Sequence, residues 1–195
     1  KGVPERLDAF GRFLELYPDR REDVVMVQIG VPTRVNLPEY QALMADVEQR
    51  VERLNATYGR DGRNVVHLIT RNLDFRELIP YYVLADVMAV TSLHDGMNLV
   101  AKEYVAARPG GDGVLILSPF TGASRELEHA IQVSPYDREG LAMAFHRALT
   151  LSPTERADRM RSLREVVAAQ NVYDWARKLI RDVRRLHLLP GMRPA

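Results

Sequence analysis

The sequence has 195 residues, which is enough for one well-filled core and lies near the upper end of the usual single-domain range. Its 46% hydrophobic and 27% charged residues are typical of a globular chain, and its net charge of +1 gives no overall field that would attract nucleic acid or an acidic membrane. The chain has no cysteine, no visible signal peptide and no apolar run of the roughly 18 residues that a membrane span needs, so we expect a cytoplasmic protein without disulfides or thiolate metal sites.

The chain opens with a helical pattern. Pro4 suits a first helical turn, and apolar residues follow at helical spacing up to residue 17. Because the sequence KGVPERL starts directly in this pattern and without a methionine, we expect the chain to be a piece of a longer protein. The continuous apolar run at 23–31 is rich in β-branched residues and is typical of a strand buried on both faces, and a second helical pattern covers 38–59.

From residue 64 onward, strands and helices alternate. Apolar runs predict strands at 64–70, 86–92, 113–118 and 131–135. Helical spacing predicts helices at 74–85, from 98 onward, and at 122–130, 137–151, 153–170 and 172–186, with Pro80 as a candidate kink in the first of them. This alternation predicts an α/β fold, a doubly wound parallel sheet with right-handed crossovers. We expect one such domain over 1–187 and a frayed tail at 188–195.

Ligands of such folds bind beyond the carboxyl ends of the strands, where bends meet helix N-termini. Three bends carry polar residues, at 30–36, 70–74 and 92–103. In the third, Gly96 allows a tight turn and Asn98 is a good N-cap for the following helix. The free N–H groups of Asn98 to Ala101, together with the helix dipole, would form an anion site. Glu103 lies about one turn further on and could accept hydrogen bonds from vicinal hydroxyls, so the bend predicts a nucleotide site.

Plainer interpretations exist for each of these residues. A helix N-terminus with Asp and Asn is usually just a cap, Lys102 is a typical solvated residue, and a lone arginine such as Arg34 in a strand-end loop is usually on the surface. Basic residues between 156 and 185 alternate with acidic ones, so they do not form a nucleic-acid-binding stripe. The histidines without metal-ligand spacing, which we expect to be packing or surface residues, are His67, His129, His146 and His187.

The segment LHDGMNLVAKEYVAA resembles the segment LRDGMNLVAKEYVA of trehalose-6-phosphate synthases, which are retaining glycosyltransferases of family 20. Further segments resemble the family in family order: KGVPERL at the start, VPTRVNLPEY at 31–40, DGVLILSPFTGASREL at 112–127 and SPYDREGLAMAFHRALTLS at 134–152. These enzymes have two Rossmann-like domains that face each other across a cleft, the arrangement known as GT-B. The resemblance implies that this chain is the C-terminal, nucleotide-sugar-binding domain and that the N-terminal acceptor domain is absent.

The resemblance also implies roles for individual residues. Lys1 matches a lysine that holds the donor diphosphate together with an arginine upstream of this chain, and Arg34 matches the arginine that binds the phosphate of glucose 6-phosphate. Leu73 falls where backbone groups read the nucleobase, Asp95 would contact hydroxyls of the donor glucose, and Glu103 would bind the ribose. The full donor-binding set that it implies is Lys1, Leu73, Asp95, Gly96, Met97, Asn98, Leu99, Val100, Ala101, Lys102 and Glu103, with Lys1 and Asp95 as the catalytic pair.

The implied reaction moves glucose from a nucleotide sugar, for which we expect UDP-glucose, to glucose 6-phosphate with retention, giving trehalose 6-phosphate. No cofactor and no metal are implied, and the isolated domain should not turn over. The chain departs from the family pattern at three positions: His94 replaces an arginine, Ser92 a proline and Pro119 a glutamate. His94 could retune contacts in the donor pocket and Pro119 could alter the loop that faces it, and the donor base stays open between UDP, GDP and ADP.

Two alternatives remain from the sequence. One is a glucosylglycerol-phosphate synthase, against which the arginine of PTRVN weighs weakly. The other is a catalytically silent regulatory homologue, against which the intact Lys1, Arg34, Asp95 and Glu103 weigh. The sequence leaves open whether the protein is a homo-oligomer and whether a phosphatase domain is attached.

Overall fold

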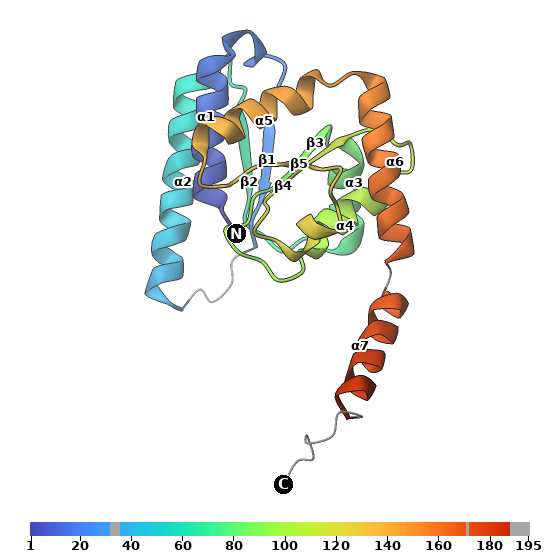
Figure 1. Ribbon diagram of the computed structural model, residues 1–195. Coiled ribbons are helices and arrows are strands. Elements are labelled where there is room, and N and C mark those ends of the chain that lie inside the picture. Colours follow the sequence, from blue (N-terminus) through green and yellow to red (C-terminus); the bar gives the residue numbers. More distant parts are fainter. Residues whose placement is uncertain (32–35, 171, 188–195) are drawn as a thin grey trace.

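Strand β4 (Val114–Leu117) lies at the centre of the apolar packing. All four of its residues are buried, and because successive strand side chains point to opposite faces, they contribute to two separate apolar clusters. Val114 and Ile116 belong to one cluster, and Leu115 and Leu117 belong to the other. The computed structural model, which describes residues 1–31, 36–170 and 172–187, therefore has helices on both faces of its strands (Figure 1).

Three helices pack on each face. On the first lie α1 (Val3–Leu16), α2 (Pro38–Tyr58) and α5 (Arg138–Thr150). On the second lie α3 (Phe75–Leu84), α4 (Leu99–Ala106) and α6 (Pro153–Ala169). Helix α7 (Val172–His187) follows α6 and extends away from these layers in Figure 1. Among the helices that the structure describes, none combines the length and apolar character needed to cross a bilayer.

The strands pair in parallel, as the sequence predicts. β1 (Met26–Ile29) pairs with β2 (Val66–Ile69), and β4 pairs with both β3 (Val87–Val90) and β5 (Ile131–Gln132). Parallel strands with helices on both faces confirm the predicted α/β class. The hydrogen bonds nevertheless divide the strands into a pair and a group of three, and α1, α2 and α5 cover both groups with one apolar cluster.

Two local predictions are wrong. The strand at 23–31 is not buried on both faces, since Val25 and Val27 are 47% and 43% exposed. The helices of the second face, α3, α4 and α6, pack over β3 and β4, and the apolar cluster beneath them contains no residue of β1.

The predicted helix at 122–130 is only a 3-10 turn, Gly122–Arg125. Side chains occupy the carbonyl groups that a longer helix would need: Gln132 Nε2 donates to the Ser124 carbonyl at 3.0 Å, and Ser124 Oγ donates to the Thr121 carbonyl at 2.7 Å. The chain then turns to bury Leu127 and Ala130. A second 3-10 turn, Pro18–Arg20, follows α1.

The remaining boundaries agree with the sequence to within a few residues. Helix α3 continues through Pro80 to its end at Leu84, so this proline does not terminate it. The expected tail at 188–195 lies outside the described residues.

Candidate functional site

The bend between β3 and α4 lies at the carboxyl end of β3 and is attached to the loop that follows β4. The Asp95 amide donates to the Phe120 carbonyl at 3.2 Å, and the Gly122 amide donates to the Asp95 carbonyl at 3.1 Å. These two bonds form a short parallel bridge between Asp95 and Thr121. The bend is therefore held against a neighbouring strand end and is not an isolated surface loop.

A glycine permits this approach. A Cβ atom on Gly122 would lie 2.0 Å from the Gly96 carbonyl oxygen, which no side chain could tolerate without moving the backbone. Gly2 plays the same role on the other side of the bend, where its Cβ would lie 2.1 Å from the Thr91 carbonyl oxygen and its φ of +69° also favours glycine. The start of the chain is thereby brought against the end of β3.

Asp95 accepts hydrogen bonds from Lys1 at the start of the chain and from two residues of the bend, Asn98 and, at 3.5 Å, the Ser92 hydroxyl. Its Oδ2 accepts from Lys1 Nζ at 2.5 Å and from Asn98 Nδ2 at 3.2 Å, and Asn98 Nδ2 also donates to Ser92 Oγ at 3.3 Å. Partial burial on its own would raise the pKa of Asp95, but the hydrogen bond and charge of Lys1 and the donors of Asn98 outweigh it and hold that pKa below its ordinary value. Asp95 is therefore a carboxylate at neutral pH, and the structure places Lys1, another predicted site residue, in contact with it.

The N-terminus of α4 differs from the prediction in one respect. Asn98 caps the helix from a left-handed conformation, φ +55°, and its Oδ1 accepts from the Ala101 amide at 3.2 Å. The Ala101 amide is therefore not free, and the amide of Asn98 itself faces the carboxylate of Asp95. Leu99 and Val100 remain, and their amides have no hydrogen-bond partner within the part of the chain that the structure describes. The anion site predicted over 98–101 is reduced to these two amides.

The two charged residues of α4 contact different neighbours. The Lys102 ammonium forms an ion pair with Glu126, so its side chain is already engaged beside the 3-10 turn. The Glu103 carboxylate accepts a hydrogen bond at 2.8 Å from the hydroxyl of Tyr82, which lies on α3. Burial and this bond raise the pKa of the Tyr82 phenol, so it stays a donor at all ordinary pH values.

The other predicted site residues are more scattered. Leu73 is half-buried directly before Asp74, whose carboxylate accepts from the Glu77 amide at 2.9 Å and caps α3. Gly96 and the side chains of Met97, Leu99 and Val100 are exposed around the bend. His94 and Pro119 are exposed as well. Arg34 lies outside the described residues.

Sequence reasoning missed Tyr82 and Gly122. Tyr82 belongs to an apolar helical pattern, where a tyrosine is normally a core residue, and nothing in that pattern shows which side chain of another helix its hydroxyl will meet. Gly122 stands between a loop and a predicted helix, and only the fold brings Gly96 beside it. A search for tyrosines on the buried face of the preceding helix would have offered the first of these as a candidate.

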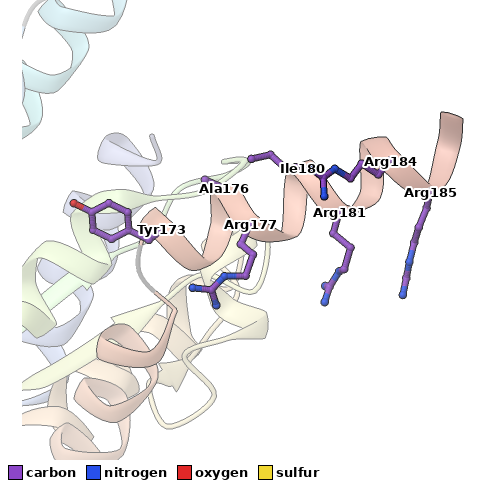
Figure 2. A pocket seen from close by; sticks show the side chains of 7 residues that line it. All are labelled: Tyr173, Ala176, Arg177, Ile180, Arg181, Arg184 and Arg185. Atoms are coloured by element: carbon purple, nitrogen blue, oxygen red, sulfur yellow. The ribbon is translucent and has the colours of Figure 1, made fainter.

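A shallow hollow on α7 is unrelated to this bend. Figure 2 shows its lining, which comes from α7 alone and includes Tyr173, Ile180 and four arginines. A surface formed by one helix has no second wall, and none of the predicted donor residues lies on it. We therefore do not regard this hollow as the functional site.

The α/β fold, with a polar bend at the carboxyl end of a parallel strand, is compatible with many nucleotide-binding proteins, and comparison with known families gives a definite assignment. The family model "Glycosyltransferase family 20" matches residues 1–185. The chain belongs to this family.

Several trehalose-6-phosphate synthases are similar to this chain. The synthase of Mycobacterium avium is 47% identical over 180 residues, which cover 92% of this chain and 37% of that protein, and the synthase of Mycolicibacterium smegmatis is 44% identical over the same share of this chain. A solved Escherichia coli structure, described as bound with UDP-2-fluoro glucose, is 39% identical with a TM-score of 0.90 and covers 93% of this chain and 41% of its own. A Burkholderia xenovorans synthase in complex with glucose-6-phosphate is 38% identical with a TM-score of 0.91, over 93% of this chain and 40% of its own.

The chain spans little more than a third of the length of the curated relatives that it matches.

Proposed function

We propose that this chain is the C-terminal, nucleotide-sugar-binding domain, residues 1–187, of a trehalose-6-phosphate synthase. The whole protein would transfer glucose from UDP-glucose to glucose 6-phosphate with retention and release trehalose 6-phosphate and UDP. The observation that carries the proposal is the start of α4, where the open amides of Leu99 and Val100 follow the carboxylate of Asp95 and precede that of Glu103 along the chain. Amides at a helix N-terminus attract a diphosphate, and carboxylates accept hydrogen bonds from sugar hydroxyls.

The donor would be held along this bend. Glu103 would accept hydrogen bonds from the ribose hydroxyls, and backbone groups at Leu73 would contact the nucleobase. Asp95, which is ionised and fixed by Asn98, would accept from hydroxyls of the donor glucose. The structure of the E. coli relative, which is described as bound with UDP-2-fluoro glucose, supports a uridine nucleotide as the donor.

The chemistry would be charge stabilisation and positioning. As the bond between the glucose and the diphosphate breaks, negative charge grows on the leaving diphosphate. Lys1, an arginine upstream of this chain and the two open amides would stabilise that charge. The acceptor hydroxyl would attack from the face that the diphosphate leaves, and a diphosphate oxygen would take its proton, so that the anomeric configuration is retained. Lys1 could bind the diphosphate because its exposed ammonium is free to move from Asp95 to an incoming phosphate group.

Arg34 would anchor glucose 6-phosphate through charge-assisted hydrogen bonds and so position its attacking hydroxyl. The missing N-terminal part of the protein would supply the rest of the acceptor pocket, and this chain alone should not turn over. The complex of the B. xenovorans relative with glucose-6-phosphate supports this acceptor.

An assay of the full-length protein with UDP-glucose tests the proposal, with glucose 6-phosphate and glycerol 3-phosphate as competing acceptors. We expect trehalose 6-phosphate as the product, and Arg34→Ala should raise the KM for glucose 6-phosphate far more than the KM for UDP-glucose. Arg34→Lys should restore only part of the loss, because an ammonium cannot form the bidentate contact of a guanidinium. Turnover with glycerol 3-phosphate alone, or no turnover with either acceptor, would contradict the proposal.

A further inference from the structure

Glu103 has an unusual set of neighbours for a carboxylate in the first turns of a helix. No ion pair among the described residues includes it, because the adjacent Lys102 pairs with Glu126 instead. Its side-chain partner is a neutral donor, the Tyr82 hydroxyl, at 2.8 Å from Oε2. A phenol fixes the direction of a carboxylate without neutralising it, so the remaining lone pairs of Glu103 stay available to other donors.

Tyr82 itself is held firmly. Its side chain is 4% exposed, and its ring meets the ring of Tyr104 edge to face, with centroids 6.5 Å apart. Around it, α3 and α4 are joined at two further points: the Tyr104 hydroxyl donates to the Ala85 carbonyl at 3.0 Å, and the guanidinium of Arg108 donates to the Val83 carbonyl. The hydroxyl of Tyr82 therefore arrives at Glu103 from a position that packing and hydrogen bonds determine.

The phenol also remains protonated. Desolvation, and then the bond to Glu103, raise its pKa, so the phenol keeps its proton at neutral pH and can donate it in a hydrogen bond to the carboxylate. This hydrogen bond lowers the entropy cost of ligand binding, because the carboxylate has already lost part of its rotamer freedom before the ligand arrives.

We propose that Tyr82 is a positioning residue that orients the Glu103 carboxylate toward a vicinal diol of the donor nucleotide. The proposal rests on the function proposed above, in which that diol is the ribose of a nucleoside diphosphate sugar. Tyr82 touches neither the sugar that is transferred nor the diphosphate, and its effect reaches the ligand through Glu103. It should therefore influence how well the protein distinguishes a ribonucleotide from a 2′-deoxyribonucleotide.

The test is a comparison of two probes, UDP and 2′-deoxy-UDP, titrated into the full-length enzyme by calorimetry. Tyr82→Phe removes one oxygen and keeps the ring in its packing. We expect it to weaken UDP binding by about 5- to 10-fold, the size of one ordinary net hydrogen bond, because Tyr82 acts on the ligand only through Glu103. Binding of 2′-deoxy-UDP should weaken by less than about 2-fold. In steady-state kinetics the KM for UDP-glucose should rise while kcat changes little, since Tyr82 does not contact the reacting atoms.

Two reference variants separate the possible outcomes. Tyr104→Phe is the matched control, because Tyr104 is the buried partner of the same ring pair and its hydroxyl binds a backbone carbonyl instead of Glu103. It should leave the ratio of the two affinities unchanged. Glu103→Gln should reduce that ratio by at least as much as Tyr82→Phe does.

If Tyr82→Phe weakens both nucleotides by the same factor while Glu103→Gln narrows the ratio, Tyr82 is merely structural and the positioning role is refuted, but the donor site stands. If Glu103→Gln leaves the ratio unchanged as well, the ribose assignment of Glu103 is refuted, and the role of Tyr82 falls with it.

Discussion

The bend between β3 and α4 and the helix α7 differ in how far the described chain completes their contacts. In the bend, Ser92, Asp95 and Asn98 bond to one another, and the backbone is tied to the loop after β4. On α7, by contrast, large apolar residues are at least 45% exposed along a helix that extends away from the layers in Figure 1. These side chains are Val172, Tyr173, Trp175, Leu179, Ile180 and Val183. The described residues therefore organise the candidate donor site by their own contacts, whereas they leave the apolar face of α7 largely exposed.

The largest expected effect is on the free energy of unfolding, and it is measured with a matched pair of leucine truncations, one on each of the two last helices. Leu163 of α6 is 1% exposed and belongs to an apolar cluster, whereas Leu179 of α7 is 49% exposed. In this chain, Leu163→Ala should lower the free energy of unfolding by about 2–5 kcal/mol, and Leu179→Ala should change it by less than about 0.5 kcal/mol. Urea denaturation followed by circular dichroism measures both. Equal losses would mean that the apolar face of α7 packs within the chain and that the contrast is false.

The next effect concerns the bend. Glu103→Ala in the full-length protein removes a charged hydrogen-bond partner of the donor and should weaken UDP binding by about 1.5–3 kcal/mol. Isothermal titration calorimetry measures the affinity, and Glu128→Ala serves as a control because Glu128 is an exposed carboxylate that is not assigned to the donor site. An affinity for UDP that Glu103→Ala leaves unchanged would remove Glu103 from the site.

The smallest effect is the pH dependence of the Lys1–Asp95 pair. Because the pKa of Asp95 is lower when the protein is folded, the pair stabilises the folded state at neutral pH, and this contribution is lost as the pH falls through the lowered pKa. Lys1→Met should therefore destabilise the chain by the same small amount at pH 7 and pH 5, below about 1 kcal/mol for so exposed a lysine, and the difference should shrink below about pH 4. Urea denaturation of the original chain and of Lys1→Met at pH 7, pH 5 and pH 3 measures this difference in the free energy of unfolding. A difference that does not shrink at all between pH 5 and pH 3 would show that Lys1 does not act through Asp95.

The sequence predicts the parts of the molecule that depend on neighbouring residues. The periodicity of apolar residues gives the order of strands and helices, and the pattern around Gly96 and Asn98 gives the cap of α4 together with the position of Asp95. Contacts between distant segments could not be predicted in this way. The exposure of Val25 and Val27 depends on which strands the helices of the second face cover, and the short turn at Gly122–Arg125 depends on Gln132, which reaches the Ser124 carbonyl only after the chain has folded back.

The same limit applies inside the site. Asn98 is a recognisable cap from sequence, but its own side chain uses the Ala101 amide, so the number of open amides depends on the rotamer that the bend imposes. Tyr82 and Glu103 are 21 residues apart, and their hydrogen bond follows from the packing of α3 on α4.

The central claim is that this chain carries the donor-binding half of the site, and titration of UDP into the isotope-labelled chain tests it most directly. A dispersed amide spectrum first establishes that the chain is folded under these conditions. At millimolar UDP we predict saturable shifts of the Leu99 and Val100 amides and of the Tyr82 and Glu103 neighbourhood, with the residues of α7 unaffected. The absence of any shift near Leu99 at millimolar UDP, in a spectrum that shows a folded chain, would contradict the claim.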